Sequence, residues 1–308
     1  MRIAVYGTGG AGGYFGARLA RAGEEVVFIA RGEHLRAIQE RGLRVETAGG
    51  EFIVRAEATD DPARAGAADV VLLGVKTWQI ADAARAMRPM MTPETLVVPL
   101  QNGVEAAGHL VAELGARHVL DGLCGTISRV VSPGNILSIG ETNFIKFGEL
   151  DSRPSERAER LRRVFERAGV RAEIPPDIRA AVWEKFIFVA PYGGVGALAR
   201  ATVGVLRALP ETRRLIERGM REILEVARAH RVSLGEGIVE KSLRLIDALA
   251  HDSTTSLHRD IVAGRPSELE AWNGAVVRLG REKEVPTPLH EFIYHCLLPS
   301  ELRARGTV

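Results

Sequence analysis

The spacing of apolar positions divides this chain into two halves. Up to Ile174, short runs that are apolar at nearly every position alternate with stretches of helical periodicity, and the clearest runs are 2–6, 25–30, 69–75 and 95–100. Such runs are typical of strands buried on both faces of a parallel sheet. From Asp177 onward the period is 3.6, which predicts helices at 178–198, 211–230, 236–249, 255–263, 267–280 and 288–297. We therefore expect an α/β domain over 1–175 and an all-α domain over 176–308.

Weaker patterns fill in the first half. They predict helices at 35–40, 78–87 and 153–168, a helical turn at 61–65, and strands at 43–47, 52–56 and 170–174. Two strand-rich segments, 119–131 and 136–147, are joined by Ser132-Pro-Gly-Asn135, which predicts a hairpin. Pro175-Pro176 ends the last strand and marks the expected domain boundary.

The first apolar run leads directly into a glycine-rich turn. Gly7-Thr-Gly9-Gly10-Ala-Gly12 follows the strand Arg2–Tyr6 and opens a helix, which is the context that a dinucleotide-binding motif requires. Gly7 permits the tight turn, Gly9 lets the backbone approach a pyrophosphate, and Gly12 lets helix and strand pack closely. This pattern predicts a Rossmann-type domain; a glycine-rich turn without a ligand is the alternative.

Arg31 follows the second strand, where a protein that prefers NAD usually has an acidic residue for the ribose 2′-hydroxyl. A guanidinium suits a 2′-phosphate in charge and in shape, so NADPH is favoured over NADH. A solvated arginine is the alternative, and Glu33 lies nearby.

Composition excludes several classes of protein. The 308 residues carry a net charge of +2, which favours neither nucleic acid nor an anionic membrane as the main partner. Cys124 and Cys296 lie far apart and the eight histidines are scattered, so we expect no disulfide framework and no metal. No secretory signal is evident and 186–198 is too short to span a bilayer, so we expect a cytoplasmic protein.

Four polar residues stand out from this background. Lys76 and Asn102 each follow a predicted parallel strand, at the sheet edge where ligands bind, although a solvated lysine and a turn-forming Asn-Gly are alternatives. Lys185 and Glu268 lie on apolar faces of predicted helices, Glu268 together with Trp272, Ala275 and Leu279. These two could face a cleft or pair as a buried ion pair. Lysine is informative here because only five of the 41 basic residues are lysines.

Motifs in both halves resemble one family. They are Gly7-x-Gly9-x-x-Gly12, Lys76-Thr-Trp-Gln79, Gln101-Asn-Gly103, Trp183-Glu-Lys185, Ser256-x-x-x-Asp260, Glu268-x-x-x-x-Asn-Gly274 and Val285-Pro-Thr-Pro288. In this order they resemble 2-dehydropantoate 2-reductase, also called ketopantoate reductase. The resemblance implies a Rossmann domain that binds NADPH, a helical domain that closes over the substrate, and reduction of ketopantoate to pantoate on the route to pantothenate and coenzyme A.

The resemblance also implies a role for each residue. Lys185 matches the catalytic lysine that polarises the C2 carbonyl and protonates the alkoxide. Glu268 matches the carboxylate that accepts a hydrogen bond from the substrate's terminal hydroxyl, and Ser256 matches a serine that contacts the substrate carboxylate. Asn102 and Lys76 match positions that place nicotinamide and substrate within hydride distance, and Arg31 matches the basic residue near the 2′-phosphate.

One feature departs from the family. Many members have asparagines four and eight residues after the catalytic lysine, where this chain has Val189 and Gly193, in a segment that a proline and several glycines disturb. Without these amides a polar substrate would bind less well, by about 1 to 3 kcal/mol for each unpaired partner.

The motifs and this departure together leave three candidate functions: an NADPH-dependent ketopantoate reductase, a reductase of another 2-oxo acid, and an NADPH sensor without catalysis. Apolar helix faces in the second half are compatible with a homodimer.

Overall fold

The chain folds into two compact units, each described here by itself. The computed structural model describes residues 1–139 and 143–308, so the part of the predicted strand at 140–142 lies outside the described residues. One unit comprises Met1–Gln101 and Glu105–Arg179, and the other comprises Asn102–Val104 and Ala180–Val308.

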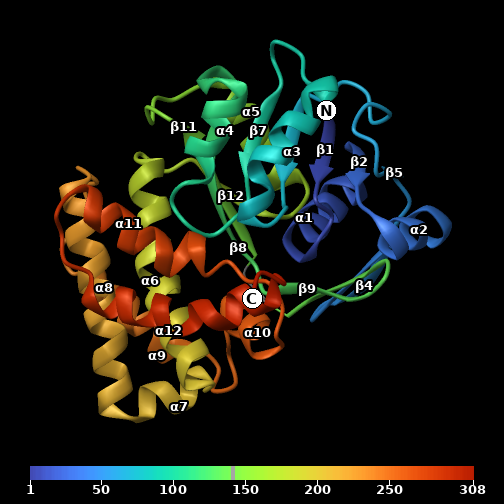
Figure 1. Ribbon diagram of the computed structural model, residues 1–308. Coiled ribbons are helices and arrows are strands. Elements are labelled where there is room, and N and C mark those ends of the chain that lie inside the picture. The colour runs from blue at the N-terminus through green and yellow to red at the C-terminus, as the bar shows by residue number, and fades with distance from the viewer. Residues whose placement is uncertain (140–142) are drawn as a thin grey trace. The chain divides into compact units, whose positions relative to one another are not determined.

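A five-stranded parallel sheet forms the centre of the first unit (Figure 1). In spatial order its strands are β5 (Glu57–Thr59), β2 (Glu25–Ile29), β1 (Arg2–Tyr6), β6 (Val70–Leu73) and β7 (Leu96–Pro99). The central strand β1 pairs in register with both neighbours, so that Ile3 lies opposite Val26 on one side and Val70 on the other. The predicted α/β fold, with a Rossmann-type parallel sheet followed by a helical domain, is confirmed.

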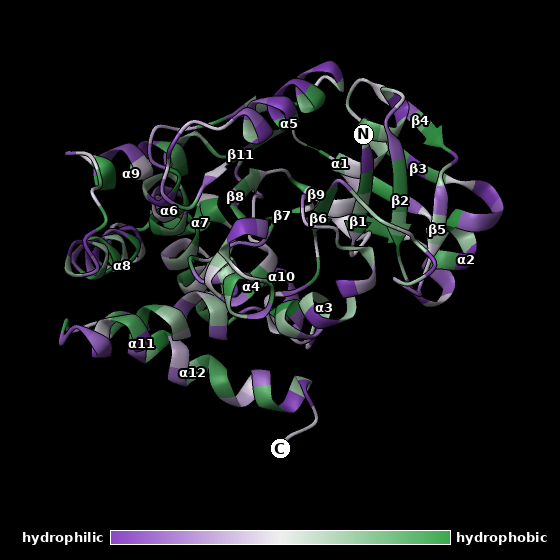
Figure 2. Ribbon diagram, turned by 90° about the horizontal axis from the view of Figure 1, so that it is seen from above, coloured by the Kyte–Doolittle hydropathy of each residue, from purple (hydrophilic) through white to green (hydrophobic). Residues whose placement is uncertain are grey.

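Helices cover both faces of this sheet. Ile3 and Val5 pack on one side against α1 (Gly10–Arg21) and α5 (Glu156–Arg167), where Phe15 and Phe165 meet edge to face at 6.2 Å. On the other side Ala4 and Tyr6 lie in a second core with α3 (Ile80–Ala86) and α4 (Ala106–Leu114). Burial on both faces explains why β1, β2, β6 and β7 are apolar at nearly every position, whereas α5 is mostly hydrophilic outside its buried stripe (Figure 2).

Two smaller sheets complete the first unit. One has the order β4 (Gly50–Val54), β3 (Leu43–Thr47), β10 (Asn135–Ser138) and β9 (Ser128–Ser132), and the other has β12 (Arg171–Glu173), β11 (Phe144–Glu149) and β8 (Leu120–Gly125). The hairpin predicted at Ser132–Asn135 is present between β9 and β10. Each strand-rich segment nevertheless forms two strands that belong to different sheets. The segment 119–131 forms β8 and β9, and the segment 136–147 contains β10 and β11.

Several predicted boundaries in this unit shift. The helix expected at 35–40 begins earlier, as α2 (Gly32–Arg41), and β5 was not expected. The helix expected at 78–87 consists of a 3-10 turn, Thr77–Gln79, followed by α3, and two further 3-10 turns lie at Arg88–Met90 and Ala116–His118. Helix α4, the first helix after β7, begins at Ala106.

The second unit contains no strand among its described residues. Its helices are α6 (Ile178–Ala199), α7 (Val203–Ala208), α8 (Pro210–Ala229), α9 (Ile238–Ala248), α10 (Ser256–Val262), a π-helical turn at Glu270–Gly274, α11 (Ala275–Glu282) and α12 (Pro288–Ala304). The sequence pattern missed α7 and ended α12 seven residues early, at Leu297. Trp272, Phe186 and Met220 are among the fully buried side chains of this core.

Helix α6 is continuous through Pro191 and the glycines that were expected to disturb it. The neighbouring helices account for this, because a Cβ on Gly219 of α8 would lie 2.8 Å from Pro191. In the same way, Cβ atoms on Gly193 and Gly194 would lie 2.8 Å from Trp272 and 2.6 Å from the Asn273 amide. Close tertiary packing therefore supports a segment that has weak helix propensity of its own.

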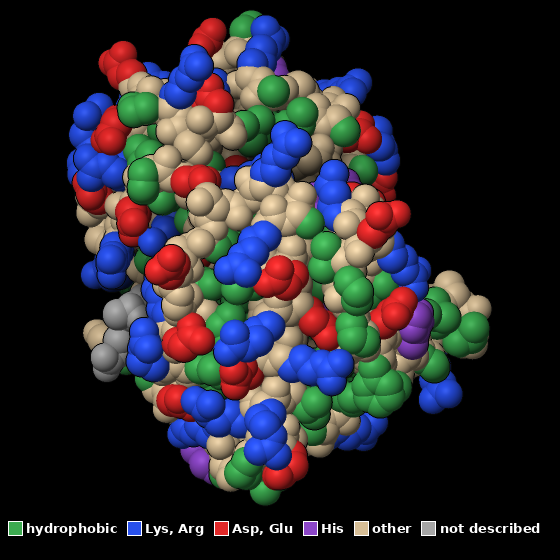
Figure 3. Space-filling model, turned by 90° about the vertical axis from the view of Figure 1, so that its left-hand side faces the viewer, with side chains coloured by type: hydrophobic (Ala, Val, Ile, Leu, Met, Phe, Trp, Pro, Cys, Tyr) green, Lys and Arg blue, Asp and Glu red, His purple; other side chains and the backbone are tan. Residues whose placement is uncertain are grey.

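Charges of both signs are mixed on the surface, and Figure 3 shows basic and acidic side chains interspersed on one face. Many arginines pair with carboxylates, as Arg221 does with Glu217 at 2.7 Å and Arg213 with Asp247 at 2.8 Å. Within residues 1–139 and 143–308, no helix combines the length and apolar character that a bilayer crossing requires.

Candidate functional site

The glycine turn lies between β1 and α1, as the sequence predicts. Gly7 has φ +97°, and a Cβ on Gly12 would lie 2.3 Å from the Gly7 carbonyl oxygen, so neither position accepts a side chain. A Cβ on Gly9 would meet nothing within 4 Å, and no side chain caps the N-terminus of α1. This open, uncapped helix start fits a dinucleotide pyrophosphate, which needs backbone N–H groups and room to approach them.

Arg31 is exposed at the N-cap of α2, directly after β2. Its guanidinium lies beside the Tyr6 hydroxyl at the end of β1: burial raises the pKa of Tyr6, and the contact with Arg31 partly lowers it. Tyr6 therefore helps to hold the Arg31 guanidinium at the end of β1, where the glycine turn begins.

Lys76 follows β6 and is half-buried. Its Nζ lies 5.9 Å from the centre of the Trp78 ring, within the range of a cation–π contact, and its backbone N–H donates to Gln79 Oε1 at 3.2 Å. Gln101, at the end of β7, donates to the carbonyl oxygens of Leu73 and Val75 at 3.0 and 2.8 Å. The motif residues Gln79 and Gln101 thus shape the loops that follow β6 and β7.

Asn102 belongs to the helical unit, although Gln101 directly before it belongs to the unit that contains the sheet. Val104 packs against the helical core, and Gly103 has φ +111° with its Cβ position 3.1 Å from the Ala271 carbonyl oxygen. A side chain at Gly103 would be strained by the backbone conformation and crowded by Ala271, which explains the glycine after Asn102.

Lys185 is half-buried on α6. In the sequence it lies between Trp183 and Phe186, two core residues whose rings meet edge to face at 5.9 Å. The adjacent Glu184 forms an exposed ion pair with Lys241 at 3.2 Å. Val189 and Gly193 follow Lys185 at intervals of four residues, so the three positions share one face of α6.

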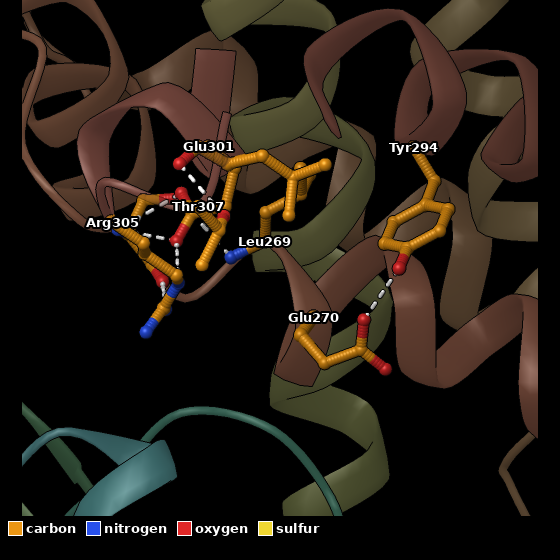
Figure 4. A network of polar contacts seen from close by, with 8 residues as sticks. Leu269, Glu270, Tyr294, Glu301, Arg305 and Thr307 are labelled. Carbon is orange, nitrogen blue, oxygen red and sulfur yellow. Dashed lines mark hydrogen bonds and ion pairs between the residues drawn. The ribbon is translucent and has the colours of Figure 1, made fainter. Parts of the chain in front are cut away.

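Glu268 is buried, but the helix expected at 267–280 begins only after it. The segment before the π-helical turn is held by Ser267, whose N–H donates to both carboxylate oxygens of Glu301 at 3.0 and 3.1 Å. Arg305 donates to Glu301 Oε1 at 2.6 Å (Figure 4). It also donates to the Ser267 carbonyl oxygen at 3.0 Å. These bonds fix the backbone next to Glu268.

The π-helical turn itself is also anchored. The Tyr294 hydroxyl donates to Glu270 at 2.6 Å (Figure 4), and burial, followed by this bond, raises the pKa of Tyr294 to about 12. Insertions of this kind occur frequently at functional sites.

Ser256 is half-buried as the first residue of α10, whose N-cap Thr255 accepts a bond from the His258 N–H at 3.1 Å. A Cβ on Gly193 would lie 3.0 Å from Thr255 Oγ1 and 2.8 Å from the Trp272 ring. Gly193, two turns after Lys185, therefore lies against Thr255, which precedes Ser256, and against Trp272, which follows Glu268 by four residues. The Trp272 ring fills the space that a side chain at position 193 would need.

Sequence reasoning missed His34, whose ring bridges the glycine turn and the β9–β10 turn. A histidine on a polar helix gave no signal by itself. Within the part of the chain that the structure describes, no three His, Cys, Asp or Glu side chains are grouped closely enough to hold a metal ion.

A Rossmann-type sheet with an open glycine turn, followed by a helical domain with a half-buried lysine, is typical of a dinucleotide-dependent oxidoreductase. Models of the ketopantoate reductase PanE/ApbA family match residues 3–152, and those of its C-terminal domain match residues 177–301. The chain belongs to the ketopantoate reductase family, which is NAD(P)-dependent.

Individual relatives agree with this assignment. The 2-dehydropantoate 2-reductase of Halobacterium salinarum is 31% identical, over 94% of this chain and 95% of that protein. A PanE/ApbA family ketopantoate reductase from Ralstonia eutropha JMP134 superposes with a TM-score of 0.91 at 31% identity, covering 99% of this chain and 100% of that one. D-mandelate dehydrogenase, solved with NADH and anilino(oxo)acetate, shares the fold at a TM-score of 0.92 with 20% identity, over 99% and 100% of the two chains.

Proposed function

We propose that this protein is an NADPH-dependent reductase of 2-dehydropantoate, which would place it on the route to pantothenate and coenzyme A. The observation that supports this most directly lies in the helical unit, where Gly193 shares a face of α6 with Lys185. Gly193 packs against Thr255, which precedes Ser256, and against Trp272, which follows Glu268 by four residues. Three residues expected to handle the substrate thus belong to elements that meet along one helix.

When bound, NADPH supplies the hydride that adds to C2 of the 2-oxo acid. In our proposal the Lys185 ammonium donates a hydrogen bond to the C2 carbonyl oxygen and then transfers a proton to the alkoxide that hydride addition leaves. Ser256 contacts the substrate carboxylate, and Glu268 accepts a hydrogen bond from the terminal hydroxyl. Lys76 and Asn102 orient the nicotinamide and the substrate.

A second candidate keeps the chemistry and changes the substrate to a different 2-oxo acid. It is favoured by Val189 and by the Trp272 ring over Gly193, because both place apolar groups on the Lys185 face of α6. An apolar wall binds a hydrocarbon side chain better than a hydroxylated one.

Steady-state oxidation of NADPH with a panel of 2-oxo acids tests these proposals. We expect saturable turnover with ketopantoate at a kcat/KM at least equal to that for 2-oxo acids with branched aliphatic or aromatic side chains. A kcat/KM about tenfold or more higher for one of those acids would reject ketopantoate in favour of the second candidate. Tight NADPH binding with no turnover of any acid would instead indicate a sensor.

The cofactor preference depends on Arg31. We expect Arg31→Ala to weaken NADPH binding by about 10- to 100-fold, because the charge-assisted bonds to the 2′-phosphate are lost, and to change NADH binding by less than about threefold. Calorimetric titration with both cofactors measures this. As a matched control, Arg41→Ala removes an exposed arginine from the other end of α2 and should change neither affinity. Equal losses for the two cofactors in Arg31→Ala would show that Arg31 does not bind the 2′-phosphate.

A further inference from the structure

The hairpin β9–β10 is seated on the first turns of α1, where the cofactor phosphates are expected. A Cβ on Gly10 would lie 2.3 Å from the Ser128 carbonyl oxygen in β9, and a Cβ on Gly13 would lie 2.9 Å from Ile136 in β10. Gly10 and Gly13 are not among the three glycines that the motif Gly7-x-Gly9-x-x-Gly12 requires. The absence of a side chain at these two positions instead makes room for the hairpin. The hairpin forms a wall beside the phosphate-binding end of α1.

His34 connects this hairpin to the glycine turn. Its Nδ1 accepts a hydrogen bond from the Gly134 N–H at 3.0 Å, and its Nε2 lies 2.8 Å from the Thr8 carbonyl oxygen. Since a backbone N–H can only donate, Nδ1 must be unprotonated, and Nε2 must carry the proton that it donates to Thr8. The contacts fix both the neutral state and the tautomer of the ring.

Both partners of His34 are themselves held in place. The Thr8 N–H donates to the Ile29 carbonyl oxygen at 3.2 Å, which ties the glycine turn to the end of β2. Gly134 has φ +78°, and its Cβ position lies 2.9 Å from Ala37, so the hairpin turn rests on α2, the helix that contains His34. A rigid imidazole between two fixed backbone groups sets the distance between the hairpin turn and the glycine turn.

We propose that His34 is a positioning residue of the dinucleotide site: its neutral ring holds Thr8 and Gly134 together and thereby keeps β9 against Gly10 beside the cofactor phosphates. This rests on the proposed dinucleotide-binding function. His34 touches neither cofactor nor substrate in this proposal, and it acts through the glycine turn and the hairpin.

Protonation of His34 would break the connection, because an N–H at Nδ1 would then face the Gly134 N–H. Burial lowers the pKa of His34 below 6.5, and the bond to Thr8 raises it by less. The glycine turn 7–12 and the hairpin turn 133–135 contain no ionisable side chain; α2 carries Glu33 and Arg36 beside His34, with Arg31 at its N-cap, and β9 carries Arg129. The connection is complete above about pH 6.5 and weakens as the pH falls toward the lowered pKa.

Titration of the full-length protein with NADP⁺, followed by calorimetry between pH 5.5 and 8, tests the proposal. At pH 8 we expect His34→Leu, which removes both bonds, to weaken binding about tenfold or more. His34→Asn can place an amide oxygen near the Nδ1 position, and His34→Gln an amide nitrogen near the Nε2 position, so each should recover part of the loss. His109→Gln, an exposed histidine of the same unit, is the control and should bind like the wild type.

The pH profile separates positioning from a general loss of stability. The ratio of wild-type to His34→Leu affinity should fall toward one as the pH falls toward the lowered pKa of His34, and titration of the 2′-phosphate cancels in this ratio because both proteins bind the same ligand. Hydrogen exchange of the peptide covering 128–138 should be faster in His34→Leu, with the other strands unchanged. Unchanged hydrogen exchange of the peptide covering 128–138 in His34→Leu, or binding of all three variants within twofold of the wild type, would overturn the proposal. A wild type that binds no dinucleotide would instead refute the proposed function.

Discussion

Lys185→Ala is expected to lower kcat by roughly 10²- to 10⁴-fold, because it removes both the ammonium that stabilises the developing alkoxide and the proton that completes the reaction. The dissociation constant for NADPH should change by less than about threefold, since the glycine turn that we expect to bind the phosphates belongs to the other unit. Stopped-flow single turnovers together with equilibrium titration of NADPH measure the two quantities separately.

Two further variants give this experiment its controls. Lys241→Ala removes an exposed lysine of the same unit, paired with Glu184, and should retain wild-type kcat. Lys185→Arg keeps the positive charge but cannot release a proton near neutral pH, so it should remain at least tenfold below the wild type. Wild-type turnover by Lys185→Ala would eliminate Lys185 as the proton donor.

Gly9→Ala is expected to weaken NADPH binding by roughly 10- to 100-fold without destabilising the fold. Gly9 has φ −78°, which alanine adopts without strain, and its Cβ position meets nothing within 4 Å. The methyl group would occupy the space through which the pyrophosphate approaches the α1 amides, and losing one bond to a charged phosphate costs about 1.5 to 3 kcal/mol. Calorimetric titration and thermal unfolding of the same sample check both parts.

The controls for Gly9→Ala are glycines with different surroundings. Gly108→Ala also adds a methyl group in open space, within α4, and should leave binding unchanged while raising stability by up to about 1 kcal/mol. Gly12→Ala should destabilise the protein by about 1 to 3 kcal/mol, because its Cβ would overlap the Gly7 carbonyl oxygen. Unchanged NADPH affinity in Gly9→Ala would mean that the phosphates do not approach this turn.

The spacing of apolar residues predicted the parallel strands and the glycine turn, because both depend on residues that are close in the sequence. The uniformly apolar runs became the parallel strands β1, β2, β6 and β7, because strands buried on both faces must be apolar throughout. The glycine turn was predictable for a similar reason, since the φ of +97° at Gly7 and the contact of the Gly12 Cβ position with the Gly7 carbonyl oxygen arise within a single strand–turn–helix unit. The roles of Lys185 and Glu268 stay predictions until the experiments above are done.

Features that depend on contacts between distant segments were not predictable. The helix expected from Ser267 begins later, because Glu301, 34 residues further on, binds the Ser267 backbone. The packing of Gly10 and Gly13 against the β9–β10 hairpin gave no signal in the sequence, since that hairpin lies more than 110 residues away. The partners of His34 are likewise backbone groups, which no pattern of side chains reveals.

The loop Asn102–Val104 has a consequence for dissecting the molecule. Because these three residues belong to the helical unit while their neighbours on both sides belong to the sheet unit, the polypeptide passes from one unit to the other three times. No single cut therefore yields two complete halves, and a fragment starting at Ala180 would lack Val104, leaving a gap in its apolar core. The two units are therefore interleaved along the sequence and are not two consecutive domains.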